Sequence, residues 1–334
     1  MTIPTDTAAP GRNTTPASRN QRRGSVAGRR GNRRPARSRW QVLPYLLLAP
    51  AVLAILVLLG YPIVSVVLTS FQKLDLAQLI QHQTVWTGFA NYQAVLSDPD
   101  FWTIVVRTLV FTVACVLAIM LGGLATAQLM RHANRVIRVV LQVSLLLAWA
   151  MPIIAATTVF QWIFDQNYGI LNKTLIDLGF HGFTGYDWFS TGFSTMAIIV
   201  LLIAWQGVPF AAFTLYAGLL TVPTELYEAA GIDGATGWQT FRSVTWPALR
   251  PIVLITMFLE VLWDFKVFTQ VWAIRQGGPD EGSTTLSVLQ YLDGISGHHY
   301  GVAAAVSVLM ILIIIVVTAQ YIRLLVRSWT REVW

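Results

Sequence analysis

The sequence has little charge and almost no cysteine. Only 12% of its 334 residues are Asp, Glu, Lys or Arg, whereas about 25% is usual for a soluble domain. Its single cysteine, Cys115, excludes an internal disulfide framework and a thiol-based zinc cluster. A Gly-x-x-x-x-Gly-Lys-Ser/Thr segment is also absent, so the chain is not expected to hydrolyse ATP by itself. With 55% hydrophobic residues, the composition indicates a polytopic membrane protein rather than a disordered chain, a coiled coil or a cytosolic enzyme.

Residues 1–39 are expected to form a solvated, disordered arm. They hold ten arginines, no lysine and one acid, Asp6, among many Pro, Gly, Ser, Thr and Asn residues. Such a segment cannot bury enough apolar surface to fold, and its positive charge suits the anionic headgroups of a membrane surface. Nucleic-acid binding is the alternative, but no aromatic residue that could stack on a base precedes Trp40.

The rest of the chain, residues 40–334, is expected to form one all-α transmembrane domain. A helix needs about 20 apolar residues to cross the hydrocarbon core, and six segments meet this requirement. Prolines inside some of them, such as Pro152 and Pro209, predict kinks. The predicted spans are about residues 43–71, 108–130, 139–164, 193–220, 252–274 and 302–322.

Basic residues alternate between the segments that connect these spans. If the arm is cytoplasmic, then the cytoplasmic segments 1–39, 131–138, 221–251 and 323–334 together hold 18 Lys and Arg residues. The outer loops 72–101, 165–192 and 275–301 hold three. This excess follows the positive-inside rule, so both termini are predicted to be cytoplasmic.

The segment 221–251 has the most distinctive sequence of the predicted cytoplasmic segments. A proline near its beginning suits a helix start, and two glutamates follow in the early turns, near the positive end of the helix dipole. Three glycines then interrupt the helix. A second short helix is expected to follow, and Pro247 and Pro251 would end it before the next span.

A run within this segment resembles the EAA motif of ABC importer permeases. Glu228-Ala229-Ala230 is followed after three residues by Gly234, and after nine more by Val244-Thr245-Trp246-Pro247. The family pattern is Glu-Ala-Ala, three residues, Gly, nine residues, Ile, any residue, Leu-Pro, so every spacing matches. Val and Trp stand where the family has Ile and Leu, which keeps both side chains apolar. The aspartate at position 233 also resembles the pattern of the sugar-importer branch of this family.

The resemblance implies the type I ABC importer permease fold, in which this segment is the coupling helix that docks in a cleft of an ATP-binding subunit. Glu228 would pair with a basic residue of that subunit. The implied partners are a second permease subunit, two ATP-binding subunits, an extracytoplasmic sugar-binding protein and the lipid of a bacterial plasma membrane. The chain itself would bind no cofactor, because ATP and Mg²⁺ belong to the partner subunits. The implied coupling residues are Glu228, Ala229, Ala230, Asp233, Gly234 and Pro247.

Two further regions resemble the same family. Residues 86–92 resemble the Gly-x-x-Asn-Tyr/Phe segment that follows the first span, and residues 263–268, with Gly277-Gly278-Pro279, resemble the second-last span of maltose-type permeases. The resemblance begins at about residue 45 and is to the first permease of a carbohydrate importer. The implied cargo is an oligosaccharide or disaccharide, with trehalose as one candidate.

The fifth predicted span carries three charged residues. A charge at mid-bilayer is costly unless it is paired or faces water. Glu260 and Asp264 are four residues apart and therefore share one helix face, whereas Lys266 is expected to point elsewhere and to pair across helices. Either this face lines the translocation path, or the charges form a structural ion pair between helices.

Polar side chains next to tryptophans occur in or near the third, fourth and fifth spans. A sugar site needs polar groups for the hydroxyls and aromatic faces for the C–H surfaces of the ring. Anchoring at the membrane interface is the alternative role of each tryptophan. The candidate path residues are Gln161, Trp162, Trp205, Gln206, Glu260, Trp263, Asp264, Lys266 and Gln270.

The sequence therefore predicts the permease subunit of an ATP-driven, binding-protein-dependent sugar importer and not an enzyme. The alternative is a proton-coupled secondary sugar transporter in which Glu260, Asp264 and Lys266 form the proton relay. That alternative leaves the segment 221–251 unexplained. An integral-membrane enzyme is a third class, and neither a metal-ligand set nor a nucleophile–base pair in the sequence supports it.

Overall fold

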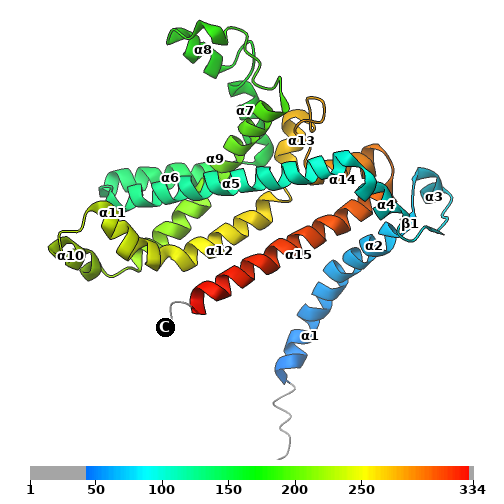
Figure 1. Ribbon diagram of the computed structural model, residues 1–334, viewed down its shortest axis with the longest axis horizontal. Coiled ribbons are helices and arrows are strands. Elements are labelled where there is room, and N and C mark those ends of the chain that lie inside the picture. The colour runs from blue at the N-terminus through cyan, green and yellow to red at the C-terminus, as the bar shows by residue number, and fades with distance from the viewer. Residues whose placement is uncertain (1–42, 331–334) are drawn as a thin grey trace, which may run out of the picture. The chain divides into compact units, whose positions relative to one another are not determined.

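The computed structural model describes residues 43–330, and the predicted all-α membrane fold is confirmed (Figure 1). Five helices in this range are long and apolar enough to cross a membrane, and a bent pair of helices makes a sixth candidate. The predicted arm at residues 1–39 lies outside the described residues. By its internal contacts the chain divides after Val57 into two units, which are described separately.

The first unit is described from α1 (Leu43–Ile55) onward. Most of the residues of this helix are Leu, Ala, Val and Ile, and Pro50 lies inside it. Its side chains from Tyr45 onward are exposed. A helix that is apolar on every side is suited to hydrocarbon or to contact with another protein surface rather than to water. A π-helical segment, Leu56–Gly60, follows it.

The second unit contains the remaining helices and one short hairpin. The strands β1 (Gln72–Lys73) and β2 (Val85–Trp86) pair antiparallel. Two further segments are π-helical, at Phe241–Thr245 and Leu292–Ser296, and His181–Phe183 forms a 3-10 turn. The α-helices are α2 (Tyr61–Ser70), α3 (Leu76–Ile80), α4 (Ala90–Ser97), α5 (Pro99–His132), α6 (Arg135–Ala150), α7 (Ile153–Ile163), α8 (Ile170–Asp177), α9 (Gly192–Leu220), α10 (Thr224–Ile232), α11 (Gly237–Thr240), α12 (Trp246–Asp264), α13 (Thr269–Arg275), α14 (Leu286–Tyr291) and α15 (Tyr300–Thr330).

The packing of α5 against α9 forms the centre of the core. Small residues let the two backbones approach closely, as is usual between helices in membranes. A Cβ atom added to Gly123 would lie 2.6 Å from the Cβ of Ala211, and one added to Gly207 would lie 2.7 Å from the Cδ1 of Ile119. The largest fully buried side chains around this contact include Ile119, Met130, Ile199, Leu202, Leu215 and Leu249.

The third predicted span, residues 139–164, is not one helix. It consists of α6 and α7, which meet at an angle of 102°. Pro152 lies at this break, and Met151 before it has an extended backbone conformation. Proline disfavours the helical conformation of the preceding residue, so the expected kink becomes a sharp turn. Pro209, by contrast, lies inside α9 without interrupting it.

The fifth predicted span, 252–274, ends earlier than expected, at Asp264. A break at residues 265–268 then leads into α13, so Lys266 lies in the break and not within a helix. The expectation that Pro247 and Pro251 would end a separate short helix is wrong. The chain is helical without interruption from Gly237 to Asp264. The π-helical turn at Phe241–Thr245 accommodates Pro247, because a wider turn loosens the backbone that the proline ring would otherwise meet.

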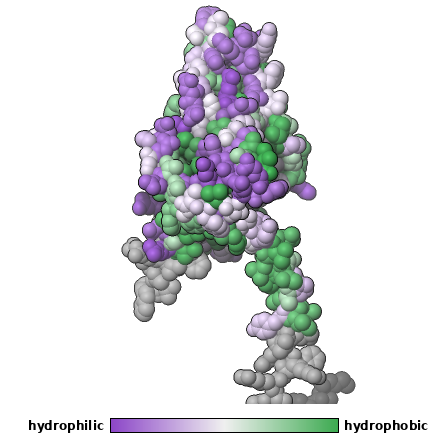
Figure 2. All heavy atoms as spheres, turned by 90° about the vertical axis from the view of Figure 1, so that its right-hand side faces the viewer, coloured by the Kyte–Doolittle hydropathy of each residue, from purple (hydrophilic) through white to green (hydrophobic). Residues whose placement is uncertain are grey.

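The helix α5 separates two groups of short elements, with α10 and α11 at one end and α3, α4 and the β1–β2 hairpin at the other (Figure 1). Asn91 belongs to residues 86–92, which resemble the segment after the first span of the permease family. Its side chain donates hydrogen bonds of 2.9 Å to the carbonyl oxygens of Ser70 and Gln72, and these bonds hold α4 against the end of α2. The hydroxyls of Tyr92 and Ser70 also lie 2.6 Å apart. In Figure 2, hydrophilic residues cover much of this end and of the segment around α8.

Candidate functional site

The segment with the EAA-like motif folds as a helix, a turn and a second helix. The helix α10 carries Glu228, Ala229 and Ala230, and Asp233 ends it. Gly234 has a φ of +72° and nothing lies within 4 Å of where its Cβ would be. Glycine is therefore required here for the backbone conformation and not for space. Thr236 then caps α11 by accepting a hydrogen bond from the backbone N–H of Gln239.

The predicted coupling residues lie on the surface of this segment. Glu228, Ala229, Asp233, Gly234 and Pro247 are exposed, and Ala230 is half-buried. Within the described part of the chain, Glu228 has no ion-pair partner. Exposed apolar side chains surround these residues, among which Ile232 is 87% exposed. An apolar tip beside an unpaired acid is typical of a surface that another protein covers.

The base of this segment is fastened to α5. The guanidinium of Arg131 stacks on the ring of Tyr227, 3.7 Å from its centroid. The hydroxyl of Tyr227 lies 3.2 Å from the Thr245 hydroxyl, which connects α10 with the π-helical turn. These contacts hold α10 in a fixed orientation while its outer face stays uncovered.

Six of the nine predicted path residues line one cavity of about 450 Å³, here called the acid cavity. It lies where α9, α12 and the α12–α13 break meet, and the α6–α7 turn forms another wall. The predicted face that Glu260 and Asp264 share is present, because both side chains line this cavity. The predicted residues in its lining are Gln206, Glu260, Trp263, Asp264, Lys266 and Gln270.

The acid cavity contains polar atoms without partners. Glu260 is 3% exposed and Asp264 is 4% exposed. One carboxylate oxygen of each, and the side-chain oxygen of Gln206, form no hydrogen bond within the described residues. Lys266 lines the same cavity but is exposed, and no ion pair of Lys266 is found in residues 43–330. The expected pairing of Lys266 across helices is therefore absent from the described part of the chain.

The remaining three candidates lie outside the acid cavity. Gln161 donates hydrogen bonds of 2.8 and 3.1 Å to the carbonyl oxygens of Ala273 and Ile274, and so ties α7 to α13. The ring of Trp205 packs 5.9 Å from that of Phe160. Trp162 is 55% exposed. Gln161 and Trp205 therefore make contacts between helices, and Trp162 lies on the surface.

Aromatic residues that sequence reasoning missed complete the wall of the acid cavity. Phe210 packs edge-to-face against Trp263, with ring centroids 5.1 Å apart. Trp149 and Phe268 line the cavity from the α6–α7 turn and the α12–α13 break. Phe210 could not be identified from the sequence, because α9 is apolar on all sides and shows no periodicity that marks one face.

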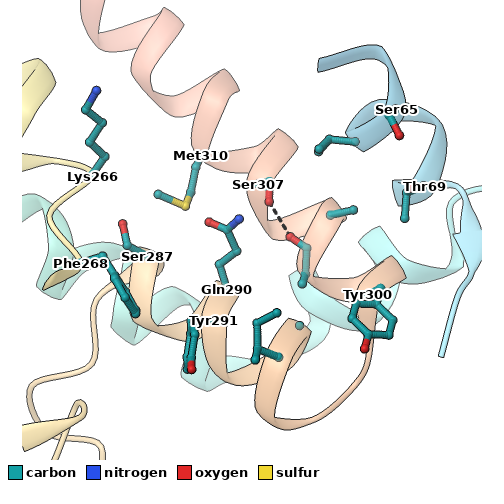
Figure 3. Close-up of a pocket in the computed structure, with 15 residues that line it drawn as sticks. Ser65, Thr69, Lys266, Phe268, Ser287, Gln290, Tyr291, Tyr300, Ser307 and Met310 are labelled. Carbon is teal, nitrogen blue, oxygen red and sulfur yellow. Dashed lines mark hydrogen bonds between the residues drawn. The ribbon is translucent and has the colours of Figure 1, made fainter. Parts of the chain in front are cut away.

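A second cavity of about 510 Å³, the hydroxyl cavity, adjoins the first at Lys266 and Phe268, which line both. Figure 3 shows Ser287, Gln290 and Met310 converging from α14 and α15, with the amine of Lys266 pointing away from them. The Ser287 hydroxyl is buried and has no partner among the described residues. The polar side chains that line the hydroxyl cavity are those of Ser65, Thr69, Lys266, Ser287, Gln290, Tyr291, Tyr300 and Ser307.

A separate lobe around α8 is held together by Asn172. Its side-chain nitrogen donates to the carbonyl oxygens of Gln166 and Tyr186, and its oxygen accepts a 2.7 Å bond from Trp188. At the base of this lobe, the backbone N–H groups of Tyr168 and Asn167 donate to the Asp165 carboxylate and hold its pKa below the ordinary value.

Comparison with known proteins gives a consistent result. Residues 118–331 match the family described as binding-protein-dependent transport system inner membrane component. The diacetylchitobiose uptake system permease protein DasB of Streptomyces coelicolor is 48% identical over 309 residues, which are 92% of this chain and 94% of that protein. The trehalose/maltose transport system permease protein MalF of Thermococcus litoralis is 30% identical, over 84% of this chain and 92% of that protein.

The same fold occurs in a solved structure. A chain of the bacterial alginate ABC transporter, crystallised in complex with its alginate pentasaccharide-bound periplasmic protein, superposes with a TM-score of 0.73. The alignment covers 84% of this chain and 93% of that chain at 18% sequence identity. Identity this low carries the fold and not the cargo.

Proposed function

The chain belongs to the family of binding-protein-dependent transport system inner membrane components, and on that basis we propose that it forms the translocation path of an importer for oligosaccharides. It is a permease subunit of an ABC sugar importer and not an enzyme. Its function is to bind and pass the cargo and to transmit motion, while separate subunits supply the chemical energy. The proton-coupled alternative loses its support, because this family works with ATP-hydrolysing partners.

One observation carries the proposed mechanism. An uninterrupted helical stretch runs from Gly237, in the EAA-like segment, to Asp264, in the wall of the acid cavity. Its 28 residues span about 40 Å at 1.5 Å per residue. A continuous helical stretch of this length connects the two ends physically, so that a displacement at one end is passed to the other. Displacement of α10 and α11 by a partner would therefore reshape the cavity at the far end of α12.

The partner at α10 is an ATP-binding subunit, which holds ATP and Mg²⁺. Glu228 pairs with one of its basic residues, and the exposed Ile232 inserts beside this pair. A second permease, a second ATP-binding subunit and a sugar-binding protein complete the assembly. ATP binding drives the switch to the state that is open to the outside, and hydrolysis resets it. The unpaired acid and the exposed apolar tip described above support this docking surface.

The cargo passes through the acid cavity. Trp263, Phe210 and Trp149 offer aromatic faces to the C–H surfaces of the sugar, and the carboxyl groups of Glu260 and Asp264, which line the same cavity, accept hydrogen bonds from its hydroxyls. Diacetylchitobiose is the first cargo to test, because the 48%-identical relative is named for it. Trehalose is the second cargo to test, because the more distant relative is named as a permease of a trehalose/maltose transport system.

Both termini and α10 face the cytoplasm, and α8 faces outward. The sequence allows a direct check, because Cys115 is its sole cysteine and is buried. In intact cells, a membrane-impermeant maleimide should label an Asp177→Cys variant on α8 at once. An Arg135→Cys variant, at the first residue of α6, should react only after the membrane is permeabilised. Labelling of Arg135→Cys in intact cells, with protection of Asp177→Cys, would reverse the orientation; the unsubstituted chain is the control for background.

Reconstitution tests the proposed function. The complex, purified with its partner subunits, is placed in liposomes with ATP inside or with a pH gradient and no ATP. We expect radiolabelled diacetylchitobiose to accumulate with ATP and the binding protein, and the pH gradient alone to drive less than about a tenth of that rate. Accumulation driven by the pH gradient without ATP would contradict the proposal and restore the proton-coupled alternative.

A further inference from the structure

The acid cavity is lined by two acidic side chains and one basic side chain. Glu260 and Asp264 are both more than nine-tenths buried, and one buried carboxylate oxygen of each has no hydrogen-bond partner among the described residues. The side-chain oxygen of Gln206 is a third such atom, although its amide can also turn to present its nitrogen. All three residues line the same cavity.

Neither buried acid has an ion-pair partner among the described residues. A buried charge is stable only when it is paired or fully hydrogen-bonded. Lys266 is the one cation in the lining, and its exposed side chain makes no ion pair with either acid in the described residues. Even with Lys266 counted, two acidic side chains and one basic side chain line the cavity. Hydroxyl or amine groups of a molecule in the cavity can act as further donors to these acids.

We propose that Glu260 and Asp264 set the charge class of the cargo. The path accepts oligosaccharides that are neutral or carry an ammonium group, because their hydroxyl and amine hydrogens satisfy the carboxylate oxygens. It rejects oligosaccharides that carry a carboxylate or a sulfonate, because a like charge within about 4 Å in a poorly solvated cavity is strongly repelled. This inference rests on the proposed function, in which the acid cavity is the sugar path.

This charge class separates the chain from a fold relative. The solved alginate transporter is described as an importer of an acidic polysaccharide. Its aligned chain has only 18% sequence identity to this chain. Similarity of fold therefore gives no reason to expect an acidic cargo here, and the buried acids of α12 give a physical reason against one.

Binding to the assembled transporter, without the binding protein and without nucleotide, tests the proposal by titration calorimetry. Three disaccharides of matched size serve as probes: diacetylchitobiose, chitobiose with both amines free and protonated, and diacetylchitobiose oxidised to a uronate at one C6. We expect the ammonium sugar to bind at least as tightly as the neutral one. The uronate should bind at least about 100-fold more weakly.

Isosteric variants assign the effect to the two acids. In Glu260→Gln/Asp264→Asn, the three affinities should agree within about threefold, because the hydrogen-bond acceptors remain and the charge is gone. If the double variant does not assemble, Glu260→Gln alone is measured instead. It should reduce the difference in affinity among the three sugars. Lys266→Gln should increase the difference in affinity among the three sugars, because this substitution removes the nearby cation.

Each outcome is informative. If the uronate binds the unsubstituted transporter as tightly as the neutral sugar, or if the isosteric variants keep the full ranking, the charge inference is wrong while the sugar path stands. If none of the three sugars binds, and ATP drives no uptake in liposomes, both the inference and the proposed function fail.

Discussion

Reversal of the charge at Glu228 should abolish sugar uptake without unfolding the chain. The side chain is exposed on α10 and has no ion-pair partner in the described residues, so Glu228→Lys removes no internal contact described here. In the proposed assembly, the lysine would face the basic group that we propose as the partner of Glu228. Loss of a buried interfacial charge pair costs about 2–5 kcal/mol. The affinity for the ATP-binding subunit should therefore fall at least about 30-fold.

The readouts are retention of the ATP-binding subunit during purification in detergent, and uptake in liposomes. Asp177→Lys is the matched control: it reverses an exposed acid on α8 and should leave the ATP-binding subunit attached. Full uptake by Glu228→Lys would contradict the docking role of α10.

Two glycines of the same segment extend this test. Nothing lies within 4 Å of an added Cβ at Gly231 or at Gly234, but only Gly234 has a positive φ. Gly231→Ala should therefore be neutral, whereas Gly234→Ala should strain the turn by roughly 1–2 kcal/mol and weaken coupling. Equal effects of both substitutions would show that the turn conformation is not what the segment requires.

Truncation of Trp263 should have the second large effect, on the cargo itself. Trp263 is 45% exposed, lines the acid cavity and packs against Phe210. A central aromatic residue of a binding site typically contributes 2 kcal/mol or more. Trp263→Ala should therefore lower kcat/KM for uptake at least about 10-fold, while the complex with the ATP-binding subunits stays intact.

Trp162→Ala is the control for this substitution. Trp162 is similarly exposed, at 55%, but lies outside the acid cavity. Both residues were candidates from the sequence alone, and the structure separates them. Uptake by Trp162→Ala should stay within about twofold of the unsubstituted level. If Trp162→Ala is the more damaging of the two, the cargo passes elsewhere.

Much of the fold could be predicted, because long apolar runs and charge alternation act over whole segments. Five of the predicted spans each overlap one long apolar helix of the described residues, and the remaining one overlaps a bent pair of helices. Pro152 turned one expected span into two helices at 102°. Pro247 did not end its helix, because a π-helical turn accommodates it. A single sequence contains no pattern that distinguishes a proline that breaks a helix from one that lies inside it.

The site was predictable only where charge or motif spacing marked it. Glu260 and Asp264 stood out because acids are rare in apolar segments, and both line the acid cavity. Gln161 and Trp205 carried the same type of sequence signal, but one ties α7 to α13 and the other packs on Phe160. The direction in which a residue points depends on helix rotation, and uniformly apolar helices give no periodicity from which to infer it.

Composition of the assembly is the most direct test of the central claim, that this chain works as one subunit of an ATP-driven importer. The measurement is purification of the chain from its native membrane in a mild detergent, followed by identification of every protein that stays bound. We predict recovery of a second permease and of a subunit with a Gly-x-x-x-x-Gly-Lys-Ser/Thr phosphate-binding loop, which this chain itself lacks. Recovery of this chain alone, with sugar transport intact after reconstitution, would contradict the account.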